Sequence, residues 1–85
     1  MKTFQIIAGS KFTWASYSVT AQDEAAARAA VEPELAICTK ADMDNMNTDC
    51  IEEDDFAYRI CDVELIDEDA EGPASIAFLK AGMNG

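Results

Sequence analysis

Two segments near the amino terminus are rich in β-branched and aromatic residues. They cover residues 3–8 and 12–20, and Gly9-Ser10-Lys11 between them has the small and polar character of a turn. This pattern predicts a β-hairpin. Alternation along its second strand predicts two faces, one with Thr13, Ala15, Tyr17 and Val19 and the other with Phe12, Trp14, Ser16 and Ser18. We expect the aromatic side chains of both faces to pack on the sheet.

A helix is predicted directly after the hairpin. Residues 25–31 have the sequence AAARAAV, which is nearly ideal helix composition. We expect Thr20 to be the N-cap and Asp23 to lie at the third helical position, where a carboxylate stabilises the positive end of the helix dipole. The helix is expected to end near Glu32, because Pro33 disfavours helical geometry in the residue before it.

The apolar runs that follow are shorter. Residues 35–38 fit a third strand at an edge of the sheet, and residues 39–55, which show no apolar period, predict a long acidic loop. Residues 56–66 alternate between apolar and polar for most of their length, which predicts the most central strand after the hairpin. Residues 67–72 predict a second acidic turn.

The last segment, residues 73–81, fits two structures. It could form a short helix with Pro73 in its first turn and Gly82 past its end, which we favour, or a strand over residues 75–79. With either ending we expect one domain over residues 1–85. Its fold class is α+β, in the order ββαββ: a single layer of antiparallel sheet packed by one Ala-rich helix.

The hydrophobic core is expected to be small. Hydrophobic residues make up 49% of the 85 residues, but 15 of them are Ala. Burial against a partner or a second copy would therefore help the fold. One functional hypothesis follows directly: a small structural or assembly module that homodimerises through its sheet, with residues 35–38 as the exposed edge.

Charge is distributed very unevenly along the chain. The net charge is −11, yet residues 1–22 contain two Lys and no acid. Residues 42–71 contain thirteen acids against Arg59 alone. Such a block repels nucleic acid and anionic membranes, because both are polyanions, and it attracts basic proteins. We therefore expect a basic protein surface as the partner, with neither direct nucleic-acid binding nor membrane binding.

Carboxylates on a strand can imitate a row of phosphates. Alternate residues of a strand lie about 6.8 Å apart on one face, which is close to two axial rises of about 3.4 Å in a nucleic-acid strand. The candidate partner-binding residues are the acids of the two predicted acidic segments: Asp42, Asp44, Asp49, Glu52, Glu53, Asp54, Asp55, Asp67, Glu68, Asp69 and Glu71.

The sequence offers little for catalysis, and we expect no enzymatic activity. His is absent, so the commonest general base and metal ligand is missing. A twelve-residue EF-hand frame that begins at Asp42 places Met46 at the fifth position and Asn47 at the sixth, where an oxygen ligand and Gly are required. No cofactor motif is present, and neither a cofactor nor a metal is expected.

The three cysteines predict no complete disulfide framework. Cys38, Cys50 and Cys61 are odd in number and lack CxxC spacing, so reduced thiols are expected. Cys61 is expected to be a small core residue of a strand. A bridge between Cys38 and Cys50 is the alternative, and it would need an oxidising compartment.

The amino-terminal residues lack the apolar core of a signal peptide, so a cytoplasmic protein is expected. The start MKTFQIIAG, and YSVTAQDEAAA leading into an Ala-rich helix, together with small size and acidity, resemble small phage-encoded proteins, among them the anti-CRISPR inhibitors. The resemblance implies a non-enzymatic inhibitor in the host-cell cytoplasm. Its acids would bind a CRISPR effector complex at a basic nucleic-acid-binding surface, by nucleic-acid mimicry.

Overall fold

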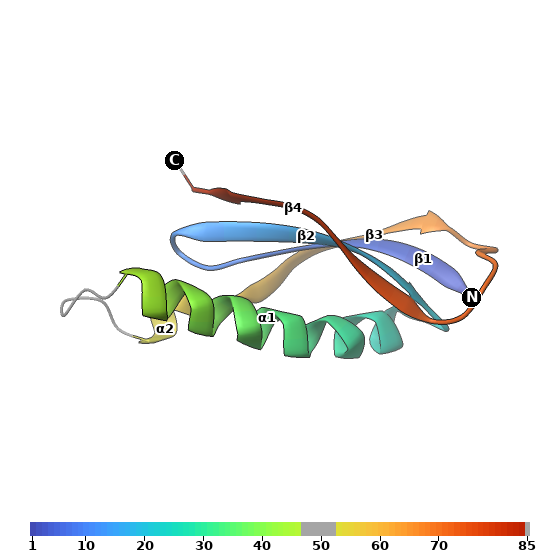
Figure 1. The fold of residues 1–85 in the computed structure, drawn as a ribbon. Helices are drawn as coiled ribbons and strands as arrows, with labels where there is room; N and C mark the ends of the chain where they lie inside the picture. The colour runs from blue at the N-terminus through green and yellow to red at the C-terminus, as the bar shows by residue number, and fades with distance from the viewer. Residues whose placement is uncertain (47–52, 85) are drawn as a thin grey trace.

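The computed structural model describes residues 1–46 and 53–84. The elements are β1 (Lys2–Gly9), β2 (Thr13–Ala21), α1 (Glu24–Met46), α2 (Glu53–Phe56), β3 (Arg59–Asp67) and β4 (Ser75–Met83) (Figure 1). The α+β class is confirmed, and so is the order ββαββ, apart from the single helical turn α2.

All neighbouring strands of the sheet are antiparallel, in the order β3-β1-β2-β4. The β1–β2 hairpin forms the centre, and β3 and β4 form the two edges. Helix α1 lies along one face of the sheet, and no described element covers the other face (Figure 1). We call these the helix face and the open face.

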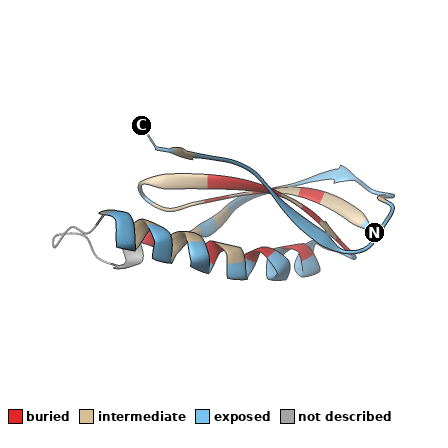
Figure 2. Ribbon diagram, viewed as in Figure 1, coloured by how far each residue is buried: buried red, intermediate tan, exposed pale blue. Residues whose placement is uncertain are grey.

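The core lies between the central hairpin and α1. Ala27, Val31 and Leu35 of the helix are buried, and their spacing of four residues keeps them on one side of α1. They pack against a set of buried strand residues: Phe4, Ile6, Ala8, Ala15, Tyr17, Val19 and Ala21. Figure 2 shows this burial on the inner side of α1 and along the hairpin. Ala15, Tyr17 and Val19, which were predicted to share one face of the second strand, therefore lie together on the helix face.

Trp14 lies on the open face, as the alternation predicts. Its partner in the neighbouring strand is Gly82 of β4. A Cβ atom at position 82 would lie 2.8 Å from the indole Nε1, so the indole rests directly on the backbone of β4. The pairing of β4 with β2 at this point requires the absence of a side chain at position 82.

The start of α1 differs from the prediction. Strand β2 continues to Ala21, and Thr20 pairs with Thr3 across the sheet, with their hydroxyl oxygens 3.0 Å apart. The N-cap is Asp23, whose Oδ1 accepts a hydrogen bond of 2.8 Å from the amide of Ala26. Thr20 is therefore a strand residue, and Asp23 caps the helix from outside it.

The predicted end of the helix at Glu32 is wrong. Helix α1 contains Pro33 and continues to Met46, so residues 35–38 are helical and form no edge strand. Burial of Leu35 in line with the earlier core residues outweighs the lost hydrogen bond at Pro33. Of the predicted acidic loop, residues 39–46 belong to α1, and residues 47–52 lie outside the described part.

The last two strands also correct the prediction. Strand β3 is an edge strand rather than a central one, since β1 and β2 occupy the centre. Its Cys61 is exposed because the register shifts between Ile7 and Ala8 of β1 and leaves Cys61 without an opposite residue. The segment after Pro73 is strand β4, so the favoured helix is wrong and the strand alternative is right.

Two adjacent isoleucines of β1 test this assignment of faces. Ile6 is fully buried on the helix face, whereas Ile7 is half-buried on the open face. We expect Ile6→Ala to lower the free energy of unfolding by about 2–5 kcal/mol, through lost burial and a residual cavity. Ile7→Ala should cost clearly less. Urea denaturation of both variants measures the difference, with Ile6→Val as a milder change, and equal losses at the two positions would contradict the assignment.

Candidate functional site

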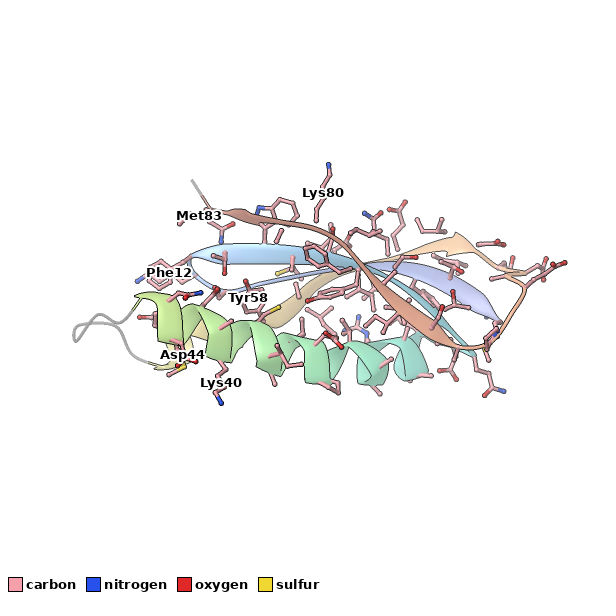
Figure 3. The ribbon with its side chains drawn as sticks, in the orientation of Figure 1. Phe12, Lys40, Asp44, Tyr58, Lys80 and Met83 are labelled. Carbon is pink, nitrogen blue, oxygen red and sulfur yellow. The ribbon has the colours of Figure 1, made fainter. Side chains whose placement is uncertain are left out.

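The described acids before β3 lie near the carboxyl end of α1 and in the short segment that precedes β3. Asp44 is exposed, and Figure 3 shows it with Lys40 on the side of α1 that faces away from the sheet. Asp55 is half-buried, and its backbone carbonyl accepts a hydrogen bond of 3.1 Å from the amide of Lys11. Two of the predicted residues, Asp49 and Glu52, and the side chains of Glu53 and Asp54 lie outside the described part.

Asp42 is half-buried, and its carboxylate bonds to side chains from other parts of the chain instead of projecting into solvent. Its half-buried carboxylate accepts a hydrogen bond from the hydroxyl of Thr13 in β2 and another, of 3.1 Å, from the hydroxyl of Tyr58. The two hydroxyls also contact each other. The backbone amide of Tyr58 donates to Thr39 of α1 at 3.1 Å. This polar cluster fastens the last turns of α1 to the hairpin and to the residues that precede β3.

The predicted acids after β3 lie in an exposed turn. Asp67 ends the strand, and its Oδ1 accepts a hydrogen bond of 3.0 Å from the amide of Asp69. Gly72 has a φ of 93°, a left-handed conformation that the turn requires and that Gly adopts most readily. The side chains of the four predicted acids of this turn point into solvent: Asp67, Glu68, Asp69 and Glu71.

The described members of the two predicted groups of acids do not meet. They lie at opposite ends of β3, which is nine residues long. A strand of that length spans roughly 27 Å. The described molecule measures 47 × 22 × 17 Å, so the two groups occupy opposite ends of its long axis. The sequence block 42–71 is therefore not one patch on the surface.

Two further acids extend the turn group along β3. Asp62 lies opposite Ile7 and Glu64 lies opposite Gln5, which places both on the open face with Asp67. Together with the turn they form a group of exposed carboxylates that begins on β3 and continues into the turn, which we call the acidic row: Asp62, Glu64, Asp67, Glu68, Asp69 and Glu71. The spacing i, i+2 of Asp62 and Glu64, interleaved with Val63 and Leu65, is the sequence signal that places these two acids on one face. Asp67 joins that face only because the register with β1 shifts and skips Ile66.

No carboxylate of the acidic row forms an ion pair within the described part of the chain. The ion pair found there joins Arg28 and Glu24 of α1, with 3.1 Å between Nε and Oε2. Arg59 lies on the same face of β3, and the amino terminus lies beside the turn, where the amide of Ala70 donates a hydrogen bond of 2.9 Å to the Met1 carbonyl. Lys80 projects from the open face (Figure 3), but it lies on β4, three strands away, or about 14 Å. The carboxylates of the row therefore repel one another and are available to an external cation or basic side chain.

Tyr58 belongs to the polar cluster, and the protein's other tyrosine, Tyr17, lies in the core. Tyr17 is buried, with its hydroxyl 3.2 Å from the Cys38 sulfur, and burial raises its pKa strongly. Burial also raises the pKa of Tyr58, with a further increase from the Asp42 carboxylate. Both phenols therefore stay protonated at neutral pH and cannot serve as general bases there. Within the described residues, no group of three Cys, Asp or Glu side chains could hold a metal ion.

The raised tyrosine pKa values predict a loss of stability at alkaline pH. An unfolded tyrosine ionises near 10.0, below the folded values, so the unfolded state releases its protons first as pH rises. The free energy of unfolding should fall progressively above that pH. We expect a shallower fall in the double variant Tyr17→Phe/Tyr58→Phe, which retains the lysines and cysteines. Urea denaturation at a series of pH values gives both slopes, and identical slopes would contradict the burial of the phenols.

The chain matches no protein-family model, no functionally characterised protein and no solved structure. No helix of the described segments is both long and apolar enough to cross a membrane. The function must therefore be inferred from the surface itself, where the acidic row is the strongest chemical feature.

Proposed function

We propose that this protein is a non-enzymatic binding protein whose acidic row occupies a basic, nucleic-acid-binding surface of a partner protein. The observation that carries the proposal is the exposed row itself, with Asp62, Glu64 and Asp67 on one face of an edge strand and three further acids in the adjoining turn. A surface lined by Lys and Arg relieves the repulsion among these carboxylates, and counterions released from both surfaces add to the affinity.

The spacing of the row supports mimicry of a nucleic-acid strand. Asp62 and Glu64 are two residues apart on one face, or about 6.8 Å, close to two axial rises of a nucleic-acid strand. The edge position matters as well. No described strand lies beyond β3, so a partner can approach these side chains from the side as well as from the open face.

The partner class follows from this chemistry. A protein that handles nucleic acid carries a cleft or stripe of basic residues, and an acidic row in that cleft excludes the nucleic acid by competition. A CRISPR effector complex, which the resemblance to anti-CRISPR inhibitors implies, is a protein of this class. On this proposal the protein inhibits by occupation and needs neither a cofactor nor a catalytic residue.

A variant in which three carboxylates of the row are replaced by uncharged amides tests the proposal. We expect Asp62→Asn/Glu64→Gln/Asp67→Asn to weaken capture of basic, nucleic-acid-binding proteins from bacterial lysate by at least about tenfold. The matched control, Glu24→Gln/Glu32→Gln/Glu34→Gln, makes the same change in net charge on α1. It should bind nearly as the wild type does. Pull-down with quantification of the captured proteins measures both, and equal losses in the two variants would mean that only total charge matters.

Salt dependence distinguishes carboxylates from aromatic anchors. Screening acts over about 8 Å at physiological ionic strength and about 3 Å at 1 M, so the affinity for the captured partner should fall steeply as salt rises. Trp14→Ala should change it little, because Trp14 belongs to β2, two strands from β3, and its indole rests on β4. Titrations at low and high salt measure this. A flat salt response with a large loss in the Trp14 variant would place the interface on the hairpin and contradict the proposal.

A further inference from the structure

Strand β4 is an edge strand with few features that would prevent another strand from pairing with it. It is nine residues long, and every residue of it except Gly82 is exposed. One side of its backbone pairs with β2, and the other side pairs with no strand of the described chain. Such an edge presents a row of free amide and carbonyl groups to another strand.

The opposite edge is protected in the ways that prevent strand pairing. Strand β3 carries charged residues at Arg59, Asp62, Glu64 and Asp67, and its register with β1 shifts at two places. Charges and bulges of this kind block edge-to-edge association. Strand β4 has a single charged residue, Lys80, and one shift in register. The edge at β3 is therefore protected against pairing with another strand, and the edge at β4 is not.

The exposed surface of β4 is apolar. Among the large hydrophobic residues that are exposed in the described chain, half belong to this strand: Ile76, Phe78, Leu79 and Met83. Phe78 is 60% exposed even though one edge of its ring contacts Tyr17, with 5.9 Å between the ring centroids. A strand whose largest side chains remain this exposed lacks a covering layer.

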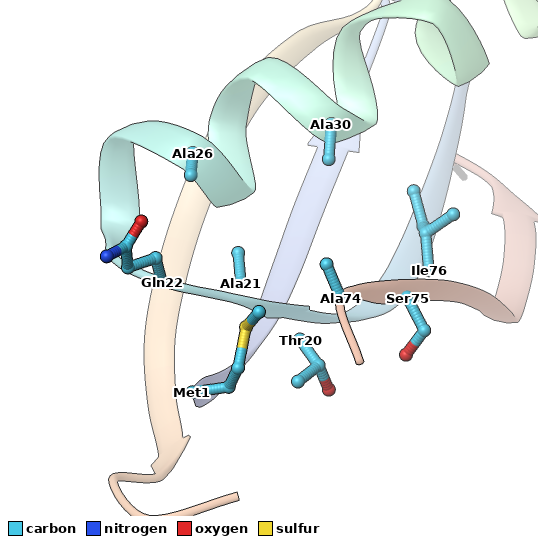
Figure 4. A pocket seen from close by; sticks show the side chains of 9 residues that line it. All are labelled: Met1, Thr20, Ala21, Gln22, Ala26, Ala30, Ala74, Ser75 and Ile76. Atoms are coloured by element: carbon cyan, nitrogen blue, oxygen red, sulfur yellow. The ribbon is translucent and has the colours of Figure 1, made fainter. Parts of the chain in front are cut away.

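An apolar pocket lies between the first turns of α1 and the start of β4. Figure 4 shows its floor and walls, which include Ala26 and Ala30 of α1 and Ile76 of β4. Ile37 lies seven residues beyond Ala30, on the same side of the helix, and is 62% exposed. Helix α1 packs on the other three strands and leaves the strip beside β4 open. The part of the helix face that lacks a covering layer therefore lies over β4.

We infer that β4 is the site at which two copies of this chain pair, antiparallel strand against antiparallel strand. An antiparallel pair of identical strands has a two-fold axis perpendicular to the sheet, so one surface serves both copies. The result is a continuous sheet of eight strands with both α1 helices on one face. Ile76 and Phe78 from both copies would then lie together on the helix face, between the two helices.

Charge distribution favours a second copy at this edge. Each chain carries a net charge of −11, so two copies repel each other over most of their surfaces. Residues 75–83 contain no acid, and pairing along them places the acids of β3, namely Asp62, Glu64 and Asp67, at the far edges of the extended sheet. The inference does not rest on the proposed function, because the β3 acids of the row lie on the other edge and stay accessible in the dimer.

Two leucines of equal exposure provide a matched test. Leu79 on β4 and Leu65 on β3 are both 47% exposed, at opposite edges of the sheet. The wild type should sediment as a dimer, with a dissociation constant below about 100 µM. Leu79→Glu should weaken the dimer by at least about tenfold, since it introduces a like charge on each side of the pairing, and Leu65→Glu should leave it unchanged. Circular dichroism checks that both variants are folded.

Phe78→Ser provides a second variant at the edge, one that removes apolar surface without adding charge. It should also weaken the dimer. Added salt should strengthen dimerisation, because it screens the repulsion between two acidic copies, whereas it should weaken binding to a basic partner. A wild-type monomer at about 100 µM, or equal effects of Leu79→Glu and Leu65→Glu, would overturn the inference. Loss of dimerisation with retained capture of basic proteins would leave the proposed function intact.

Discussion

The structure depends on one packing contact, between a single stripe of α1 and the central hairpin. Ala27, Val31 and Leu35 press against β1 and β2, and they provide the helix's share of the buried core. One helix is too narrow to cover four strands, because a helix with its side chains is about 10–12 Å wide and strands lie about 4.8 Å apart. Part of the helix face must therefore stay uncovered, and in this fold that part lies over β4.

This constraint makes the two edges of the sheet chemically different. The edge at β3 is exposed and charged, and its carboxylates continue into the following turn. The edge at β4 is exposed and apolar. The hairpin between them separates the two by the width of the sheet, so each edge can act without interfering with the other. In a chain of 85 residues, this division provides two interaction surfaces from a single layer of sheet.

The sequence predicted the parts of the fold that depend on local pattern and missed those that depend on tertiary contacts. The hairpin, its two faces and the Ala-rich helix follow from alternation and composition, and all three are present. The helix was expected to end at Pro33 because local geometry disfavours its continuation, but burial of Leu35 carries it further. The position of β3 at an edge could not be predicted, since strand order depends on how the chain returns after α1. For the same reason the acids of one sequence block lie in different places. Asp62 and Glu64 lie on the face of β3 that also carries Asp67, whereas the carboxylate of Asp42 is hydrogen-bonded to Thr13 and Tyr58.

The contact between Trp14 and Gly82 has a practical consequence. Trp14 is the protein's single tryptophan, and its indole lies on the backbone of β4 where that strand pairs with β2. Its fluorescence therefore originates from one defined place, the seam between the stable hairpin and the last strand. Detachment of β4 would bring water onto the indole and shift its emission to longer wavelength, while far-ultraviolet circular dichroism would still report an intact helix. The chain thus contains its own optical probe for local opening of this strand, separate from global unfolding.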